Sequence, residues 1–365
     1  MKRKAIVVLI AIGILFTACT KSFEISGNSD VNSKILNEVY YTTSGFYAKL
    51  SGNYLVVVEK GLKVINLNTK KVIKQIDVAN NGFDIYGTKI VWSAYSGKRK
   101  QDNESHEVKN MDIFLYDIVN NKTKQITASS TGKVEPKIWG DYIVWQDNRN
   151  DSIKDDYSEW DIYLYNMSTK QEKQITTAPG IHTRPSINDY KIVWEDGRNF
   201  TGNMGLRWGE NVPENNTDIY MYDIKTGKET AISTKPLQEC KPDVNKNYVV
   251  WEDRNEKAFA ADIYMYDFKT KKTTKVTDDK YNQTEPKLFD KYIVWMDERN
   301  GTSSNDVIIN GQAPNSDIFL YDIQAKKEYL MTGKEPQIMP VISNRYIACI
   351  TSRQIKPEIQ VIKYK

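Results

Sequence analysis

The stretch Asp-Ile-Tyr-Met-Tyr-Asp-Ile-Lys-Thr-Gly-Lys-Glu-Thr, residues 218–230, decides the fold of this chain. Its segment Ile219-Tyr220-Met221-Tyr222 alternates at period two, and the segment Lys225-Thr226-Gly227-Lys228 has the composition of a turn. Alternation followed by turn residues predicts a β-strand that enters a hairpin.

The same pattern recurs along the chain. The hexapeptide Asp-Ile-aromatic-apolar-Tyr-Asp/Asn begins at Asp112, Asp161, Asp218, Asp262 and Asp317. A second motif, apolar-Val-Trp, ends at Trp92, Trp145, Trp194, Trp251 and Trp295. Degenerate copies of this motif at residues 54–57 and 346–349 bring the number of units to seven.

The spacing between motifs separates a fixed part of the unit from a variable part. From each hexapeptide Asp to the next repeat proline the distance is 24 residues four times and 23 once. From each repeat Trp to the following Asp it is 20, 16, 24, 11 and 22 residues. A fixed length indicates packed strands in set register, and the variable length indicates one surface loop per unit.

Each unit has four segments with strand character: one through the proline, the Tyr-Ile-Val-Trp segment, the hexapeptide, and the Lys-Gln-Ile-Thr segment. Radial repetition of four-stranded units predicts an all-β fold, a seven-bladed β-propeller of antiparallel blades. The seventh unit has only three strands (337–343, 345–351 and 358–364), so we expect the N-terminal segment 34–41 to close it. Six blades with ragged ends would leave that segment without a place.

These units resemble TolB-related propeller repeats, on the residues 218–230 quoted above and the segment Tyr-Val-Val-Trp-Glu-Asp-Arg-Asn, 248–255. The resemblance covers roughly residues 34–365 and implies a propeller domain of the kind found in cell-surface proteins that bind partners. We expect no counterpart of the additional N-terminal α/β domain of TolB, which separates the chain from a direct Tol-system role.

The N-terminus predicts export. Residues 1–18 combine Lys2, Arg3 and Lys4 with an apolar run that is shorter than the roughly 20 residues of a membrane span. The segment Leu15–Cys19 resembles a bacterial lipoprotein box, which predicts lipidation of Cys19 and a tether over 19–33. The alternative is a plain signal peptide with an incidental cysteine. A lipidated protein would be held on the outer side of the cell membrane, or at the outer membrane of a Gram-negative cell.

Composition limits the partners. Removing residues 1–18 reduces the formal charge from +4 to +1, and no Lys/Arg cluster suggests nucleic-acid binding. Cys240 and Cys349 fall in non-adjacent units, so we expect no disulfide between them.

Most recurring polar and aromatic residues have a structural interpretation. The five repeat tryptophans are expected in the packing between neighbouring sheets. The motif Asp-x-Arg-Asn follows three of them, at Asp147, Asp196 and Asp297, and we expect the Asp to cap a turn and pair with the Arg. A ring of carboxylates that binds metal or sugar is the functional alternative.

The long variable loops (93–111, 146–160, 195–217 and 296–316) should gather on one face around the channel, where function is often located. Their off-register aromatic and basic residues are the candidate ligand-binding residues: Tyr157, Trp160, Arg207 and Trp208. The alternative is that these side chains pin the loops to the propeller body.

No catalytic residue, cofactor or metal site is predicted. His106 and His182 are the only histidines, and no nucleophile motif is present. We therefore expect a scaffold that binds a protein or a cell-envelope glycan through its long-loop face. Two alternatives stay open: an envelope assembly factor, and a polysaccharide lyase or hydrolase that uses carboxylates such as Glu195, Glu210, Glu214, Glu252 and Asp155.

Overall fold

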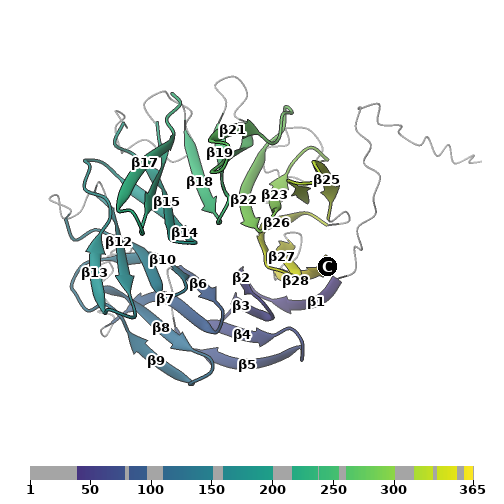
Figure 1. The fold of residues 1–365 in the computed structure, drawn as a ribbon. Coiled ribbons are helices and arrows are strands. Elements are labelled where there is room, and N and C mark those ends of the chain that lie inside the picture. The colour runs from purple at the N-terminus through teal and green to yellow at the C-terminus, as the bar shows by residue number, and fades with distance from the viewer. Residues whose placement is uncertain are drawn as a thin grey trace, which may run out of the picture. The chain divides into compact units, whose positions relative to one another are not determined.

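The computed structural model describes residues 39–78, 82–96, 110–150, 159–199, 216–236, 238–254, 260–300, 316–331, 335–351 and 357–364. Contacts within the chain separate residues 33–365 from residues 1–32, and the propeller lies in the former. The described residues form seven four-stranded antiparallel sheets arranged in a ring (Figure 1), which confirms the predicted fold. They include no helix with the length and hydrophobicity needed to cross a membrane.

Blades 1 to 6 each use four consecutive strands, and blade 7 combines both ends of the chain. The innermost strands are β2 (Tyr47–Ser51), β6 (Phe83–Tyr86), β10 (Lys133–Trp139), β14 (His182–Asn188), β18 (Glu239–Val244), β22 (Gln283–Phe289) and β26 (Gln337–Ile342). The second strands are β3 (Tyr54–Val58), β7 (Lys89–Tyr95), β11 (Tyr142–Asp147), β15 (Lys191–Asp196), β19 (Tyr248–Arg254), β23 (Tyr292–Asp297) and β27 (Tyr346–Thr351). The third strands are β4 (Leu62–Asn66), β8 (Met111–Asp117), β12 (Asp161–Asn166), β16 (Asp218–Asp223), β20 (Ala261–Asp267), β24 (Asp317–Asp322) and β28 (Glu358–Lys363). The outermost strands are β5 (Lys71–Ile76), β9 (Lys122–Gln125), β13 (Gln171–Gln174), β17 (Lys228–Ser233), β21 (Lys272–Lys275), β25 (Lys327–Leu330) and β1 (Val39–Ser44).

The N-terminal strand closes the ring, as expected. β1 pairs antiparallel with β28, from Val39 opposite Ile362 to Ser44 opposite Glu358. The predicted closing segment was 34–41, whereas the strand runs over 39–44, and residues 34–38 lie outside the described ranges. Tyr40 fixes the strand to its neighbours, because its hydroxyl donates to Leu67 O at 3.0 Å.

The hydrophobic core lies between the blades rather than within them. Trp194, fully buried, packs with Val144 and Ile162 of blade 3 and with Ile187 and Ile192 of its own blade. The other four repeat tryptophans occupy equivalent places with at most 2% of their surface exposed, as predicted. Each therefore contributes on the order of 3–5 kcal/mol relative to alanine.

The repeat prolines lie at bulges within the innermost strands. The register of β10 against β11 shifts between Val134 and Lys137, around Pro136. Glu135, which precedes this proline, has a φ of 52°, and its counterparts before the other repeat prolines have similar values. A bulge accommodates proline because its residue does not join the ladder.

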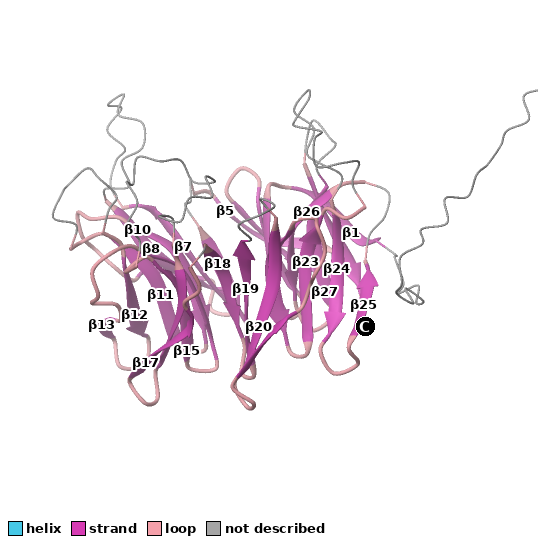
Figure 2. Cartoon of the chain, turned by 90° about the horizontal axis from the view of Figure 1, so that it is seen from above, coloured by secondary structure: helices cyan, strands magenta, loops and turns pink. Residues whose placement is uncertain are grey.

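The two ends of the blades form two different faces (Figure 2). The variable segments leave between the second and third strands, where Asp147 pairs with Asp161, and we call this end the long-loop face. The short connections between first and second strands lie at the other end, which we call the turn face. Trp139 pairs with Tyr142 beside such a connection.

Candidate functional site

The seven innermost strands enclose a central channel of about 630 Å³. Their side chains alternate in direction, so every second residue enters the lumen. Nine of the lining residues are charged: Lys49, Asp84, Glu135, Lys137, Arg184, Lys241, Asp243, Glu285 and Lys287.

Toward the long-loop face, the bulges place charged residues in the lumen. The residue before each repeat proline has a left-handed backbone conformation, which is strained for a residue with a side chain. In three blades, at Arg184, Lys241 and Glu285, a buried side chain of the preceding blade accepts this residue's N–H. Arg184 N donates to Gln146 Oε1 at 2.6 Å, and Lys241 N donates to Glu195 Oε1 at 2.6 Å. At Gln146, Glu195 and Glu252 the residue after the repeat Trp thus fixes the next blade's bulge.

Glu195 and Glu252, which the sequence offered as carboxylates for catalysis, have this bridging role. Both are fully buried. Glu195 Oε1 lies 3.0 Å from Arg184 Nη1, and Glu252 Oε1 lies 3.1 Å from Lys241 Nζ. Burial raises the pKa of Glu252, although Lys241 opposes that shift. Neither carboxylate is accessible as a general acid or base, because each is enclosed by the blades that it joins.

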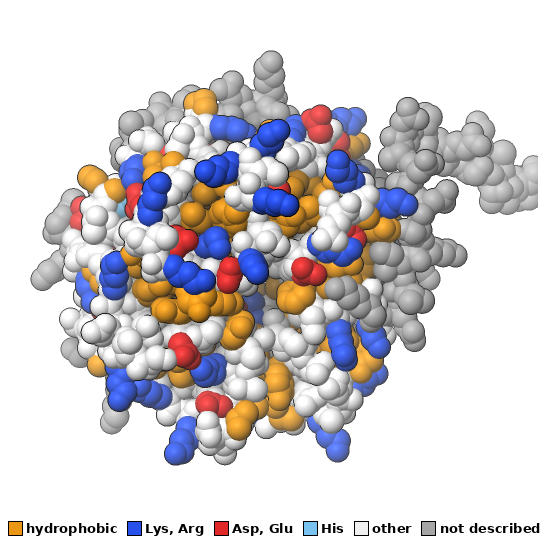
Figure 3. All heavy atoms as spheres, viewed as in Figure 1, with side chains coloured by type: hydrophobic (Ala, Val, Ile, Leu, Met, Phe, Trp, Pro, Cys, Tyr) orange, Lys and Arg blue, Asp and Glu red, His pale blue; other side chains and the backbone are white. Residues whose placement is uncertain are grey.

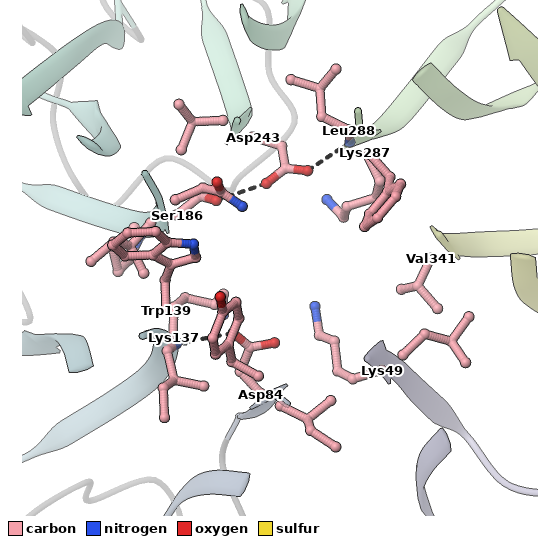
Figure 4. A pocket seen from close by; sticks show the side chains of 18 of the residues that line it. Lys49, Asp84, Lys137, Trp139, Ser186, Asp243, Lys287, Leu288 and Val341 are labelled. Atoms are coloured by element: carbon pink, nitrogen blue, oxygen red, sulfur yellow. Dashed lines mark hydrogen bonds between the residues drawn. The ribbon is translucent and has the colours of Figure 1, made fainter. Parts of the chain in front are cut away.

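Toward the turn face, a second level of charges surrounds the lumen (Figure 4). Asp243 accepts from Ser186 Oγ at 2.7 Å and from Leu288 N at 2.8 Å, so its carboxylate joins three blades. Asp84 likewise accepts Ile138 N of the next blade at 3.0 Å, and burial raises its pKa. Both carboxylates are thereby bound to the channel wall.

An aromatic rim lies at the turn-face mouth, and the sequence interpretation had not singled it out. Trp139 is half-buried, with its ring 6.1 Å from Tyr86 and 4.8 Å from Tyr190 between centroids. Hydrophobic side chains gather beside the charged hollow at the centre of the molecule (Figure 3). A usable signal was present, since Trp139 is a tryptophan outside the repeat position that immediately precedes a Gly-Asp turn.

The predicted ligand residues are largely outside the described ranges. Tyr157, Arg207, Trp208 and the lipidation candidate Cys19 all fall there. Trp160 is described: it is 7% exposed and packs with Met111 and Val134. Its backbone carbonyl accepts His182 N at 2.8 Å. This position matches the alternative that the residue pins its loop, and ligand binding by Trp160 stays a prediction.

The Asp-x-Arg motif forms an internal network at the long-loop end of each second strand that carries it. Trp194 Nε1 donates to Asp196 Oδ2 at 2.8 Å, and Arg198 binds both oxygens of Asp196 at 2.7 Å each. The guanidinium lies 3.8 Å from the ring centroid of Tyr220. The motifs at Asp147 and Asp297 make the same Trp–Asp and Arg–Asp contacts. The structural interpretation of these residues therefore holds.

Two further observations concern the chemistry of the site. Cys240 and Cys349 are buried free thiols, as expected. Within the described ranges, no cluster of three or more His, Cys, Asp or Glu side chains could hold a metal ion.

No family model and no curated protein sequence matches the chain. Among solved structures, an acylaminoacyl peptidase from Pyrococcus horikoshii is similar with a TM-score of 0.61 and 12% identity, over 90% of this chain and 52% of that one. The β-propeller domain of the Trilobed protease from Pyrococcus furiosus has a TM-score of 0.58 and 11% identity, over 90% and 97% of the two chains. TolB from Acinetobacter baumannii has a TM-score of 0.44 and 12% identity, over 87% and 79%. At such identities, the first two likenesses show the propeller fold alone.

Proposed function

We propose that this propeller is a lipid-anchored, extracytoplasmic scaffold that binds a protein or a cell-envelope glycan without catalysis. One observation carries the non-catalytic part: the described channel carboxylates are engaged in joining blades or in ion pairs. Glu285, for example, lies 2.7 Å from Lys241, and Glu135 lies 3.1 Å from Lys137. A lyase or hydrolase that works through carboxylates needs them to reach substrate in distinct protonation states.

Either face can carry the ligand. The long-loop face remains proposed on the grounds of its variable loops and of Tyr157, Arg207 and Trp208. The turn face has its support in the half-buried Trp139 and in the charged hollow beside it. Concave sites with aromatic walls and a few charged groups are typical of ligand pockets.

The binding proposal is tested with intact cells. The full chain is crosslinked in place, and captured protein and glycan are compared with captures by Trp208→Ala, Trp139→Ala and Val119→Ala. Val119 is a control because it is 73% exposed and lies at the outer turn after β8. Loss of a saturable partner in one tryptophan variant, with retention in the control, supports the scaffold and identifies its face.

Catalysis is tested in parallel with purified envelope polysaccharides. New reducing ends or unsaturated sugars that appear with the wild-type chain would overturn the non-catalytic proposal and favour the lyase or hydrolase. An unchanged polysaccharide that still binds supports the scaffold.

The anchor is tested through Cys19→Ala. We expect the wild-type chain to partition with membranes and to carry acyl chains on an N-terminal cysteine by mass spectrometry. The variant should lose both properties. An unmodified N-terminus produced by cleavage at another residue would support the plain signal peptide instead.

A further inference from the structure

The lysines of the turn-face level provide the starting observation. Lys49 of β2, Lys137 of β10 and Lys287 of β22 come from three separate blades and line one cavity (Figure 4). Among the described residues, neither Lys49 nor Lys287 is in ion-pair contact with a carboxylate. Lys287 Nζ instead donates to the carbonyl of Pro286 at 3.1 Å.

The two acidic groups at this level do not neutralise the lysines by direct contact. Asp84 and Asp243 accept backbone N–H groups of the following blades, at 3.0 and 2.8 Å, and these bonds hold them against the wall. Lys137 is paired with Glu135 at 3.1 Å, so Lys49 and Lys287 are the ammonium groups at this level that have no ion-pair contact among the described residues. Both line a cavity that is partly removed from water, where a hydrogen bond to an anion is stronger than in bulk solvent.

The charges around Lys49 act on it in both directions. Burial is the largest effect that lowers its pKa and repulsion from Lys137 and Lys287 lowers it further, whereas Asp84 and Glu135 oppose the shift. An anion bound among these groups would relieve that repulsion.

The rim adds a second chemical feature. Trp139 lies between the channel and an adjoining hollow of about 540 Å³, since its ring lines both. That hollow also contains the polar side chains of Asp141, Asn166 and Ser168. A sugar ring has C–H groups on its faces and hydroxyls on its edge, so it can contact an aromatic ring and polar groups together.

We propose that the turn-face mouth binds a negatively charged saccharide, with a carboxylate or phosphate between Lys49 and Lys287 and a sugar ring against Trp139. The proposal rests on the glycan-binding branch of the proposed function and names its ligand class and face. A cavity of 630 Å³ has room for a few sugar units. Because the site is concave, it favours an oligosaccharide over the flat surface of a folded protein.

The test uses the full chain purified in detergent, with calorimetric titration. The probes are a glucuronate hexasaccharide, a glucose hexasaccharide of equal length, a phosphate-bearing hexasaccharide, inorganic phosphate and hexaglutamate. The variants are Lys49→Met with Lys287→Met, Trp139→Ala, and the control Lys122→Met on the exposed strand β9. Circular dichroism and thermal midpoints show whether each variant is folded.

We expect the glucuronate or the phosphate-bearing hexasaccharide to bind at least about tenfold more tightly than the neutral one, and the preferred of the two to identify the anionic group. The double lysine variant should lose that preference, Trp139→Ala should weaken binding of every saccharide, and Lys122→Met should match wild type. Equal binding of charged and neutral probes, or full binding by the folded lysine variant, overturns the proposal. So does tightest binding of hexaglutamate or of inorganic phosphate alone.

Complete absence of saccharide binding also overturns it. In that case a partner captured from cells through Trp208 would leave the proposed scaffold standing with its ligand on the other face. The two proposals therefore fail separately.

Discussion

His182 and Glu239 occupy the same position, the first residue of the innermost strand, in blades 4 and 5. Both are fully buried. In blade 4 the imidazole lies between two carboxylates, with Nδ1 at 3.4 Å from Asp161 and Nε2 at 3.5 Å from Asp196. Its hydrogen bond is among those that lower the pKa of Asp161 against the opposing effect of burial.

In blade 5 the same position holds an acidic side chain that lies near other acidic side chains. Burial raises the pKa of Glu239 to about 8, and the negative charges of Asp253 and Asp218 contribute to the rise. Burial also raises the pKa of Asp218, which holds the hexapeptide position that Asp161 holds one blade earlier. A buried repeat position can therefore keep its place in the packing while a basic side chain is replaced by an acidic one.

A change from Thr to Ser accompanies this reversal. The hydroxyls of Thr127 and Thr176 donate to the hexapeptide carboxylates Asp112 and Asp161, at 2.8 and 2.9 Å. The equivalent Ser233 contacts Glu239 instead, and Asp218 Oδ1 is a buried oxygen without a hydrogen bond. The Ser233 hydroxyl of blade 4 has thus exchanged a hydrogen bond within its own blade, to Asp218, for one to Glu239 of blade 5.

The largest difference in stability between the two blades is expected when the Asp two residues after the repeat Trp is removed. Asp196→Ala leaves Trp194 Nε1 and the Arg198 guanidinium without their buried acceptor, so we expect a loss of about 3 kcal/mol in the free energy of unfolding. Asp253→Ala should cost about 1 kcal/mol or less, because its partner Lys235 is 41% exposed. Urea titrations measure both, with the exposed Asp278→Ala as the control. Equal losses at 196 and 253 would contradict the contrast between the blades.

A smaller effect, visible only as pH changes, is expected from Glu239→Gln. The folded pKa of about 8 lies above the ordinary value of 4.5, so the unfolded chain releases this proton first. The free energy of unfolding should therefore fall as pH rises from about 5 to 8. The Gln variant should lose that part of the fall and exceed wild type in stability near pH 8. Thermal midpoints across this range test the sign, and parallel profiles for the two proteins would refute it.

The smallest change should follow from Ser233→Thr. The added methyl group favours the rotamer used in the other blades, which would return the hydroxyl to Asp218 at the expense of Glu239. We expect a net change below about 1 kcal/mol, because one hydrogen bond replaces another. A double-mutant cycle with Asp218→Asn isolates the new contact, and zero coupling would mean that the hydroxyl has not moved.

The sequence was sufficient for the ring, the number of blades and the closing strand, because each follows from periodicity and from counting strands. It was insufficient at Pro185, where the bulge is fixed by a hydrogen bond from Arg184 N to Gln146 Oε1 of the preceding blade. Trp139 was overlooked because its importance arises from three blades meeting at the channel mouth, which no single repeat contains. The sequence left open whether Trp160 binds a ligand or pins its loop, because its packing with Met111 and Val134 joins segments that are far apart in the chain.

The pairing of β1 with β28 has a mechanical consequence. In blade 7, strands β1 and β28 come from opposite ends of the chain and are joined by pairing alone, with Val39 opposite Ile362. A pulling force on the segment ahead of β1 therefore acts directly on this one pair of strands. A circular permutant that joins these ends and opens a turn in blade 5, at residues 268–271, would move the unlinked ladder to that blade. The weakest point of the ring under load is therefore set by where the chain is cut, and not by the chemistry of any blade.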